Sequence, residues 1–221
     1  MSAIKAVISD FGGVLTAPLS DAFAALQEGS DITLEQLGLA MLGVAQRDGA
    51  NPLFELETGR LSERDFLARL AAALSDQAGR KIELHGFGEA YMEKLAPNAE
   101  MIEYMRSLRA RGLRMAILTN NVREWEPLWR AKLPVDEIFE LVVDSGFVGI
   151  RKPDPEIYRL TLERLGLQAR DCAFVDDTEI NCDAARELGI APVWFRSNEQ
   201  AIAELDAILA ADSGESRRGL G

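Results

Sequence analysis

Short runs of apolar residues recur along the chain, and each is followed by polar residues or glycine. The runs are rich in β-branched side chains and cover residues 6–9, 115–118, 141–143, 172–175 and 192–195. Runs of this length are typical of strands that are buried on both faces. From Pro97 onward, segments with helical periodicity separate the runs. This alternation predicts an α/β fold, with a doubly wound (Rossmann-like) parallel sheet covered by helices on both faces.

Capping residues indicate where the helices of this sheet fold begin and end. The predicted starts are side chains that accept hydrogen bonds from free helix amides, and the predicted ends are glycines. The starts are Asn98, Asp154 (with Pro155 after it) and Ser197, and the ends are Gly112, Gly166 and Gly189. A further helix is expected over residues 123–131.

Residues 17–95 interrupt the alternation, because helical periodicity is the only pattern there. Four short amphipathic helices are expected. Their boundaries are marked by Ser20, by a capping box of Thr33 and Gln36, by Ser62, Asp65 and Gly79, and by Leu84 and Leu95. Such a block predicts a small helical bundle, here called the cap, that is inserted above one edge of the sheet.

The patterns divide the chain into three parts. Residues 1–16 and 96–212 are expected to form the α/β core, and residues 17–95 the helical cap. Residues 213–221 are polar, rich in Gly and Ser, and without periodicity. We predict that this tail is disordered.

The composition is that of an ordinary globular protein with an acidic surface. Hydrophobic residues make up 48% of the chain and charged residues 27%, and the formal net charge is −12. A negative field of this size repels nucleic acid and anionic membranes, so neither is an expected partner. The chain has no apolar run of membrane-spanning length and no secretory signal pattern, so we expect a cytoplasmic protein. Cys172 and Cys182 lack a metal-ligand spacing and are expected to be buried thiols.

Polar side chains stand at the predicted carboxyl ends of three strands. Each of them alone could be a helix cap or a turn residue. In a parallel sheet, however, all strands end along one edge, so groups that are distant in the sequence converge there. The converging residues are Asp10, Thr119, Asn120, Asp176 and Asp177, with Lys152 in a turn just before a helix. Their convergence makes this edge the candidate site.

Asp176 and Asp177 are adjacent carboxylates at the end of a strand predicted to be buried. Two such acids repel each other unless a cation lies beside them, and a site rich in oxygen ligands suits Mg²⁺ better than zinc. The single histidine, His85, lies in the cap segment. A hard cation held by Asp10 and Asp177 near Lys152 would create a local positive site in an acidic protein. Such a site favours a phosphate group as ligand.

The order of these motifs resembles that of the haloacid dehalogenase (HAD) superfamily of phosphohydrolases. The matching segments are Asp10–Val14, Leu118–Asn120, Lys152 with the following Pro-Asp-Pro, and Asp176–Asp177 with Asn181. The resemblance covers almost the whole chain and places the helical insertion after the first motif. Within the superfamily, the chain is similar to bacterial glucose-1-phosphate phosphatases and to the N-terminal phosphatase domain of soluble epoxide hydrolase.

The resemblance implies a catalytic role for each motif. Asp10 would be the nucleophile that forms an aspartyl-phosphate. Thr119 and Asn120 would bind the phosphoryl group, and Lys152 would bind it and neutralise its developing charge. The implied substrate is a small phosphorylated metabolite.

The resemblance also implies a Mg²⁺ site, and it reveals one departure from the family pattern. The implied ligands are the Asp10 side chain, the Gly12 backbone carbonyl, Asp177, and Asp176 directly or through water. Most phosphatases of the family have a second Asp two positions after the nucleophile, where it acts as general acid and then as general base. Here that position is Gly12, so only the carbonyl role remains.

The missing acid leaves three functions open. The first is a Mg²⁺-dependent phosphomonoester hydrolase, and the second is a metal-independent 2-haloacid dehalogenase or a phosphonatase-like hydrolase. The third is a catalytically silent phosphate-binding module. The related dehalogenases need no metal and typically lack an acidic pair. Phosphonatases use a lysine of the cap in catalysis, and the residues around Lys81 and Lys94 give no sign that either lysine has this role. The acidic pair therefore favours the phosphatase.

Substrate specificity is expected to reside in the cap. Phe54, Arg47 and Arg60 are conceivable substrate contacts, and Glu55 or Glu57 could supply the acid that is absent at Gly12. The sequence pattern does not choose among them, nor does it specify an oligomeric state.

Overall fold

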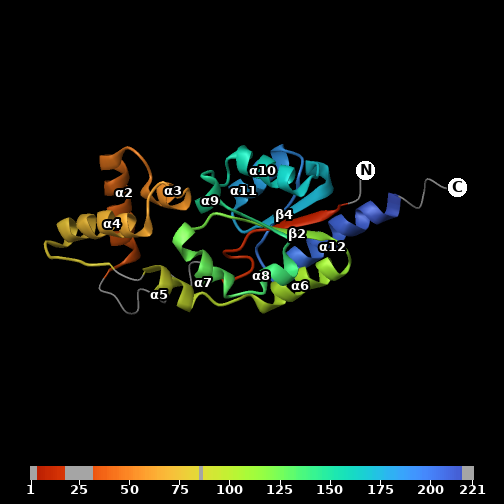
Figure 1. Ribbon diagram of the computed structural model, residues 1–221, viewed down its shortest axis with the longest axis horizontal. Helices are drawn as coiled ribbons and strands as arrows, with labels where there is room; N and C mark the ends of the chain where they lie inside the picture. The colour runs from red at the N-terminus through yellow and green to blue at the C-terminus, as the bar shows by residue number, and fades with distance from the viewer. Residues whose placement is uncertain (1–3, 18–31, 85–86, 216–221) are drawn as a thin grey trace.

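A five-stranded parallel sheet forms the centre of the computed structural model, which describes residues 4–17, 32–84 and 87–215 (Figure 1). The strand order is β3-β2-β1-β4-β5. The strands are β1 (Ala6–Ser9), β2 (Arg114–Thr119), β3 (Leu141–Asp144), β4 (Cys172–Asp176) and β5 (Ala191–Trp194). The predicted doubly wound parallel sheet is thus confirmed.

The central strand β1 is buried on both faces, as its apolar sequence predicts. Ser9 is in register with Ile117 of β2 and with Val175 of β4. These three strands therefore run toward the same edge at the same level. The groups that follow them, Asp10 and Asp176 among them, are brought to that edge by strand pairing.

Helices cover both faces of the sheet because successive side chains of a strand point to opposite sides. Val7 of β1 packs in the cluster formed with α6 (Ala99–Ala110) and α12 (Asn198–Glu215), whereas Ile8 packs with α10 (Pro155–Leu165) and α11 (Glu179–Glu187). Figure 1 shows these two helical layers above and below the strands. Shorter helices complete the core: η1 (Arg123–Trp125), α7 (Glu126–Arg130), α8 (Val135–Ile138), α9 (Ser145–Val148) and η2 (Ala169–Asp171).

The cap contains α2 (Leu34–Asp48), α3 (Pro52–Glu57), α4 (Glu63–Ala78) and α5 (Phe87–Lys94). The predicted capping box of α2, the Ser62 cap of α4 and its Gly79 end are all present. The helix expected after Ser20 lies outside the described residues. The structure adds α3, which periodicity did not reveal because six residues are too few to show a pattern.

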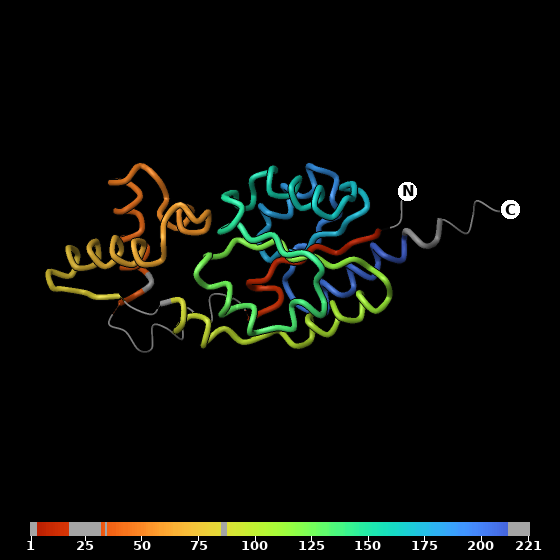
Figure 2. Tube along the Cα trace, in the orientation of Figure 1, coloured from red at the N-terminus to blue at the C-terminus, as the bar shows by residue number. Residues whose placement is uncertain are grey.

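The α2, α3 and α4 helices form a lobe beside the core, while α5 lies against α7 (Figures 1 and 2). The chain leaves and re-enters the core through two adjacent segments. There Ala17 N donates to the Ala96 carbonyl (2.7 Å) and Asn98 N to the Leu15 carbonyl (2.9 Å). We propose that core (1–16 and 96–212) and cap (17–95) divide at these segments.

The C-terminal helix is longer than expected. Helix α12 continues to Glu215, so residues 213–215, which the sequence analysis assigned to a disordered tail, are helical. Helix propagation adds one hydrogen bond per residue, so an established helix continues through a few residues of low propensity. Residues 216–221 lie outside the described residues. Within the described ranges, no helix is both long and apolar enough to cross a bilayer.

Asp144 makes the stability of this core depend on pH. It precedes α9, and its Oδ1 accepts a hydrogen bond from Gly146 N (2.8 Å). Burial raises the pKa of Asp144 from 3.8 to about 6. The folded protein therefore keeps this proton up to about pH 6, whereas the unfolded chain loses it near pH 4. Between these values the folded state binds more protons, so rising pH destabilises it, by roughly 3 kcal/mol in total.

The variant Asp144→Asn should remove this pH dependence, because the amide keeps the Oδ1 acceptor but does not ionise. Relative to the native protein, its free energy of unfolding should rise by about 2–3 kcal/mol between pH 4 and pH 7. Urea unfolding of both proteins at several pH values measures the difference. A difference that does not change with pH would contradict the account of Asp144.

Candidate active site

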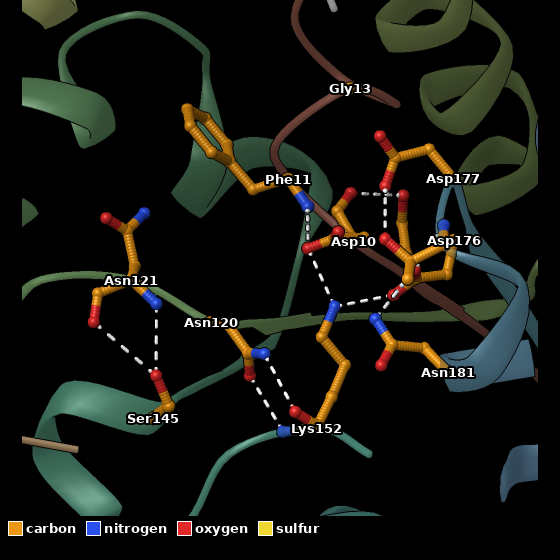
Figure 3. Close-up of polar contacts among 12 residues, drawn as sticks. Asp10, Phe11, Gly13, Asn120, Asn121, Ser145, Lys152, Asp176, Asp177 and Asn181 are labelled. Atoms are coloured by element: carbon orange, nitrogen blue, oxygen red, sulfur yellow. Dashed lines mark hydrogen bonds and ion pairs between the residues drawn. The ribbon is translucent and has the colours of Figure 1, made fainter. Parts of the chain in front are cut away.

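A buried lysine lies between two carboxylates at the carboxyl edge of the sheet (Figure 3). Lys152 Nζ is 2.9 Å from Asp10 Oδ1 and 2.6 Å from Asp176 Oδ2, and only 1% of the lysine side chain is exposed. Burial alone would lower the pKa of Lys152, but the two carboxylates raise it above its usual value. The group is therefore an ammonium ion fixed beside Asp10.

Asn120 holds the main chain of this lysine in place. Its Oδ1 accepts from Lys152 N (2.8 Å), and its Nδ2 donates to the Lys152 carbonyl (3.0 Å). The sequence analysis expected Asn120 to bind substrate. In the structure its carboxamide is occupied by Lys152, so the role that the contacts support is the positioning of the lysine.

Asp176 is completely buried and fully engaged. Besides Lys152 on Oδ2, its Oδ1 accepts hydrogen bonds from Thr178 N (2.8 Å) and Asn181 Nδ2 (2.9 Å). Asn181 is in turn held by Tyr158, whose hydroxyl donates to the Asn181 carbonyl (2.9 Å). The sequence analysis matched Asn181 to a family motif but did not include it in the site. Its position in the first turn of α11, five residues after Asp176, is the signal that could have found it.

Asp177 is less buried, and it lies against the loop that follows β1. Its Oδ1 accepts a hydrogen bond from Thr178 Oγ1 (3.2 Å). A Cβ atom on Gly13 would lie 2.1 Å from Asp177 Oδ2, and Gly13 has a φ of 78°. Both the space and the backbone conformation therefore require glycine at this position. The second glycine of the Asp-Phe-Gly-Gly sequence thus allows the first loop to contact the acidic pair.

The three carboxylates form one cluster, in which ligand oxygens of Asp10, Asp176 and Asp177 lie within 4.8 Å of one another. The pKa of Asp10 is raised to about 7, chiefly by burial; Lys152 opposes this rise, and Asp176 and Asp177 contribute to it. Burial and Asp176 also raise the pKa of Asp177. A divalent cation would relieve this repulsion, and an all-oxygen donor set fits Mg²⁺. The proposed Gly12 carbonyl ligand stays a prediction.

Thr119 is the last residue of β2 and is 1% exposed. It is in register with Asp144 of β3, and it precedes Asn120, which holds Lys152. The fold thus brings Thr119 to the same edge of the sheet as Asp10. Its predicted contact with a phosphoryl oxygen stays a prediction.

One helix of the cap contacts the turn that carries the lysine. Arg151 Nε is 2.6 Å from Glu57 Oε2, and the Arg151 guanidinium carbon lies 3.9 Å from the centre of the Phe54 ring. The pKa of Glu57 is raised because the effect of burial is larger than the opposing effect of Arg151. Of the cap residues that the sequence analysis considered, Phe54 and Glu57 contact Arg151 of the core. The others form ion pairs inside the cap, Arg47 with Asp48 and Arg60 with Glu55.

The part of the chain that carries Asp10, Lys152 and the acidic pair is similar to known sequences. The profile of the haloacid dehalogenase-like hydrolase family matches residues 4–189. The chain belongs to this family. It is therefore an HAD-like hydrolase, and the resemblance seen in its motifs is confirmed.

Relatives of this HAD-like hydrolase include phosphatases and also longer proteins whose names do not mention a phosphatase. Acyl-CoA dehydrogenase family member 10 of Mus musculus is 28% identical over 93% of this chain and 19% of that protein. Bifunctional epoxide hydrolase 2 of Sus scrofa is 27% identical over 93% of this chain and 39% of that protein. Phosphorylated carbohydrates phosphatase of Thermotoga maritima is 28% identical over 86% and 84%, respectively. The chain thus spans less than half the length of the two mammalian relatives.

Solved structures share the fold. An HAD family enzyme of Bacteroides thetaiotaomicron, in complex with magnesium and inorganic phosphate, has a TM-score of 0.63 at 20% identity, covering 87% of this chain and 94% of that one. The L-2-haloacid dehalogenase of Xanthobacter autotrophicus, with chloropropionic acid covalently bound, has a TM-score of 0.59 at 22% identity, covering 92% and 83%. The fold therefore occurs both in an enzyme that binds magnesium and phosphate and in a dehalogenase, so the fold alone does not distinguish the two functions.

Proposed function

We propose that the protein is a Mg²⁺-dependent phosphomonoester hydrolase that acts on a small phosphorylated metabolite through an aspartyl-phosphate. The observation that carries the proposal is the cluster of Asp10, Asp176 and Asp177 beside the buried Lys152. Lys152 supplies one positive charge beside three carboxylates, so negative charge remains in excess, and a divalent cation would offset it. The phosphatase relatives and the magnesium complex of a solved neighbour support the same choice.

Asp10 attacks phosphorus, and a bond forms from its carboxylate oxygen to phosphorus as the bond to the leaving oxygen breaks. The leaving oxygen takes up a proton from solvent, since position 12 carries no acid. Water then attacks phosphorus and gives up a proton to solvent, the bond to Asp10 breaks, and orthophosphate leaves with the carboxylate restored. Lys152 favours the ionised form of Asp10 and offsets negative charge on the phosphoryl group. Asp10, Asp177 and the Gly12 carbonyl, with Asp176 directly or through water, would hold Mg²⁺, which would supply further positive charge beside the phosphoryl group.

The alternative is a metal-independent dehalogenase, which the absent second aspartate at Gly12 favours and with which the fold is compatible. The two functions separate in one assay of the purified protein. A panel of phosphomonoesters and 2-haloacids is offered with Mg²⁺ and with excess EDTA, and phosphate and halide are measured. We expect phosphate to be released in the presence of Mg²⁺ and not in EDTA. Halide release in EDTA would support the dehalogenase, and no turnover with any substrate would support the silent module.

Gly12 predicts the kind of leaving group that the enzyme prefers. A general acid contributes roughly 10²- to 10⁴-fold by protonating the leaving oxygen, and the need for it falls as that oxygen becomes less basic. The native enzyme should therefore prefer anomeric sugar 1-phosphates, acyl phosphates and aryl phosphates over alkyl phosphates such as sugar 6-phosphates. Its kcat/KM should fall steeply as the pKa of the leaving group rises.

The variant Gly12→Asp should flatten this dependence, because the added carboxyl can donate the proton. Gly12, unlike Gly13, does not have a positive φ, so its backbone accepts a side chain. Gly12→Asn is the matched control, since it has the same size and cannot act as an acid. A flat native profile would show that the proton comes from another group, and Glu57 is the cap carboxyl next to the Lys152 turn.

A further inference from the structure

An exposed tryptophan contacts the main chain of the acidic pair. Trp194 is the last residue of β5 and is 38% exposed. Its indole Nε1 donates a hydrogen bond to the Asp177 carbonyl (3.0 Å). The neighbouring residue, Phe195, donates from its backbone N to the Asp176 carbonyl (2.9 Å). The indole therefore adds one more hydrogen bond to the pairing of β4 with β5, one residue beyond the end of β4.

Asp177 is the carboxylate of the cluster whose position depends most on such a contact. Asp10 and Asp176 are both bonded to Lys152, and Asp176 accepts two further hydrogen bonds. Asp177 follows the last residue of β4 and precedes α11, so its peptide belongs to neither element. Its side chain has the weaker contact with Thr178 Oγ1 (3.2 Å). The peptide that follows Asp177 is held at both ends, because Thr178 N donates to Asp176 Oδ1 (2.8 Å) and the Asp177 carbonyl accepts from the indole (3.0 Å). The indole is the contact to this peptide that comes from another strand, and the orientation of the peptide influences the direction of the Asp177 carboxylate.

Trp194 is itself held on the side away from Asp177. Gln200 Nε2 donates to the Trp194 carbonyl (3.0 Å). Gln200 also closes the start of α12, where Gln200 N donates to Ser197 Oγ (3.2 Å) and Ser197 N donates to Gln200 Oε1 (3.4 Å). The Arg196 guanidinium carbon lies 5.6 Å from the centre of the indole ring. The main chain of Trp194 is thus tied to the start of a long helix of the core, although its side chain is partly exposed.

We propose that Trp194 is a positioning residue that orients Asp177 for Mg²⁺. This inference rests on the proposed function, since it assumes that Asp177 is a metal ligand. Groups that orient metal ligands typically change metal affinity 10- to 100-fold when they are removed. Because Trp194 bonds the main chain of the ligand and not its carboxylate, we expect the lower end of this range.

The test is Mg²⁺ binding without substrate, measured by isothermal titration. Trp194→Phe keeps an aromatic ring and removes the donor, and its Kd for Mg²⁺ should rise about tenfold. Arg196→Gln is the matched control, because it removes the charge over the ring but leaves the indole donor, and its Kd should stay within about twofold of native. If native protein binds and Trp194→Phe binds equally well, the role of Trp194 is overturned and the proposed function stands. If native protein binds no Mg²⁺, the proposed function is overturned as well.

A second measurement uses the unmodified protein, in case Trp194→Phe does not fold. The indole N–H resonance of Trp194 should shift as Mg²⁺ is added, with the same midpoint as the binding titration. It should also exchange with solvent more slowly than an exposed indole, because the proton is hydrogen-bonded. An indole resonance that exchanges freely and does not respond to Mg²⁺ would overturn the proposal.

Discussion

Replacing Asp10 with asparagine is expected to lower kcat at least a thousandfold, about 4 kcal/mol in the activation barrier. The amide is a poor nucleophile, and it carries no charge to hold a cation or to pair with Lys152, which lies 2.9 Å away in the native protein. Steady-state phosphate release from the best substrate of the panel measures the loss.

Asp144→Asn is the matched control for this variant. It makes the same substitution at another buried aspartate near the end of a strand, outside the carboxylate cluster, and should keep kcat within about threefold of native. Circular dichroism of both variants checks that the fold survives. If Asp10→Asn kept activity within about tenfold of native, roughly 1.4 kcal/mol, Asp10 would not be the nucleophile.

Replacing Asp177 with alanine is expected to raise the Mg²⁺ concentration for half-maximal activity at least tenfold. The alanine leaves Asp10 and Asp176 without the third carboxylate of the cluster, and each lost charged ligand weakens the attraction for a divalent cation. Native enzyme in excess EDTA should release no phosphate, and Mg²⁺ should restore the activity.

Asp183→Ala is the control, because Asp183 is an exposed acid of the nearby helix α11 that pairs with Arg186 outside the cluster. Its Mg²⁺ requirement should match that of the native enzyme. Full activity of native protein in chelator would contradict the magnesium account and favour the dehalogenase. An unchanged Mg²⁺ requirement in Asp177→Ala would remove Asp177 from the metal site.

The fold could be predicted from the sequence where its determinants are local. Buried strands and capped helices depend on residues within one or two turns, as at Thr33 with Gln36 and at Asp154 with Pro155. The convergence of Asp10, Lys152 and Asp176 also followed, because parallel strands must end at one edge. Helix α3 was missed because it has only six residues. The end of α12 was placed too early because composition alone does not locate the last residues of a helix.

The finer structure of the site depends on contacts between distant residues, and these leave no local pattern. Asn120 holds Lys152 across 32 positions, and Arg151 pairs with Glu57 across 94. The need for Gly13 arises from the Asp177 side chain, which approaches it from another strand end. Likewise, nothing in the sequence around Trp194 indicates that its indole contacts Asp177. The residue types indicated which chemistry the site could support. Which of these residues contact one another depends on the direction of each side chain, and the sequence does not show that direction.

The most direct test of the central claim is the fate of heavy oxygen in a single turnover. Enzyme in excess over substrate is allowed to react in water labelled with heavy oxygen, and both the released product and the peptide that contains Asp10 are weighed by mass spectrometry. Hydrolysis of an aspartyl-phosphate by attack at phosphorus places the label in orthophosphate and leaves Asp10 unlabelled, which is the result we predict. A carbon ester of Asp10, as in dehalogenation, is hydrolysed at the carboxyl carbon. Label in Asp10 and none in phosphate would therefore contradict the phosphatase account.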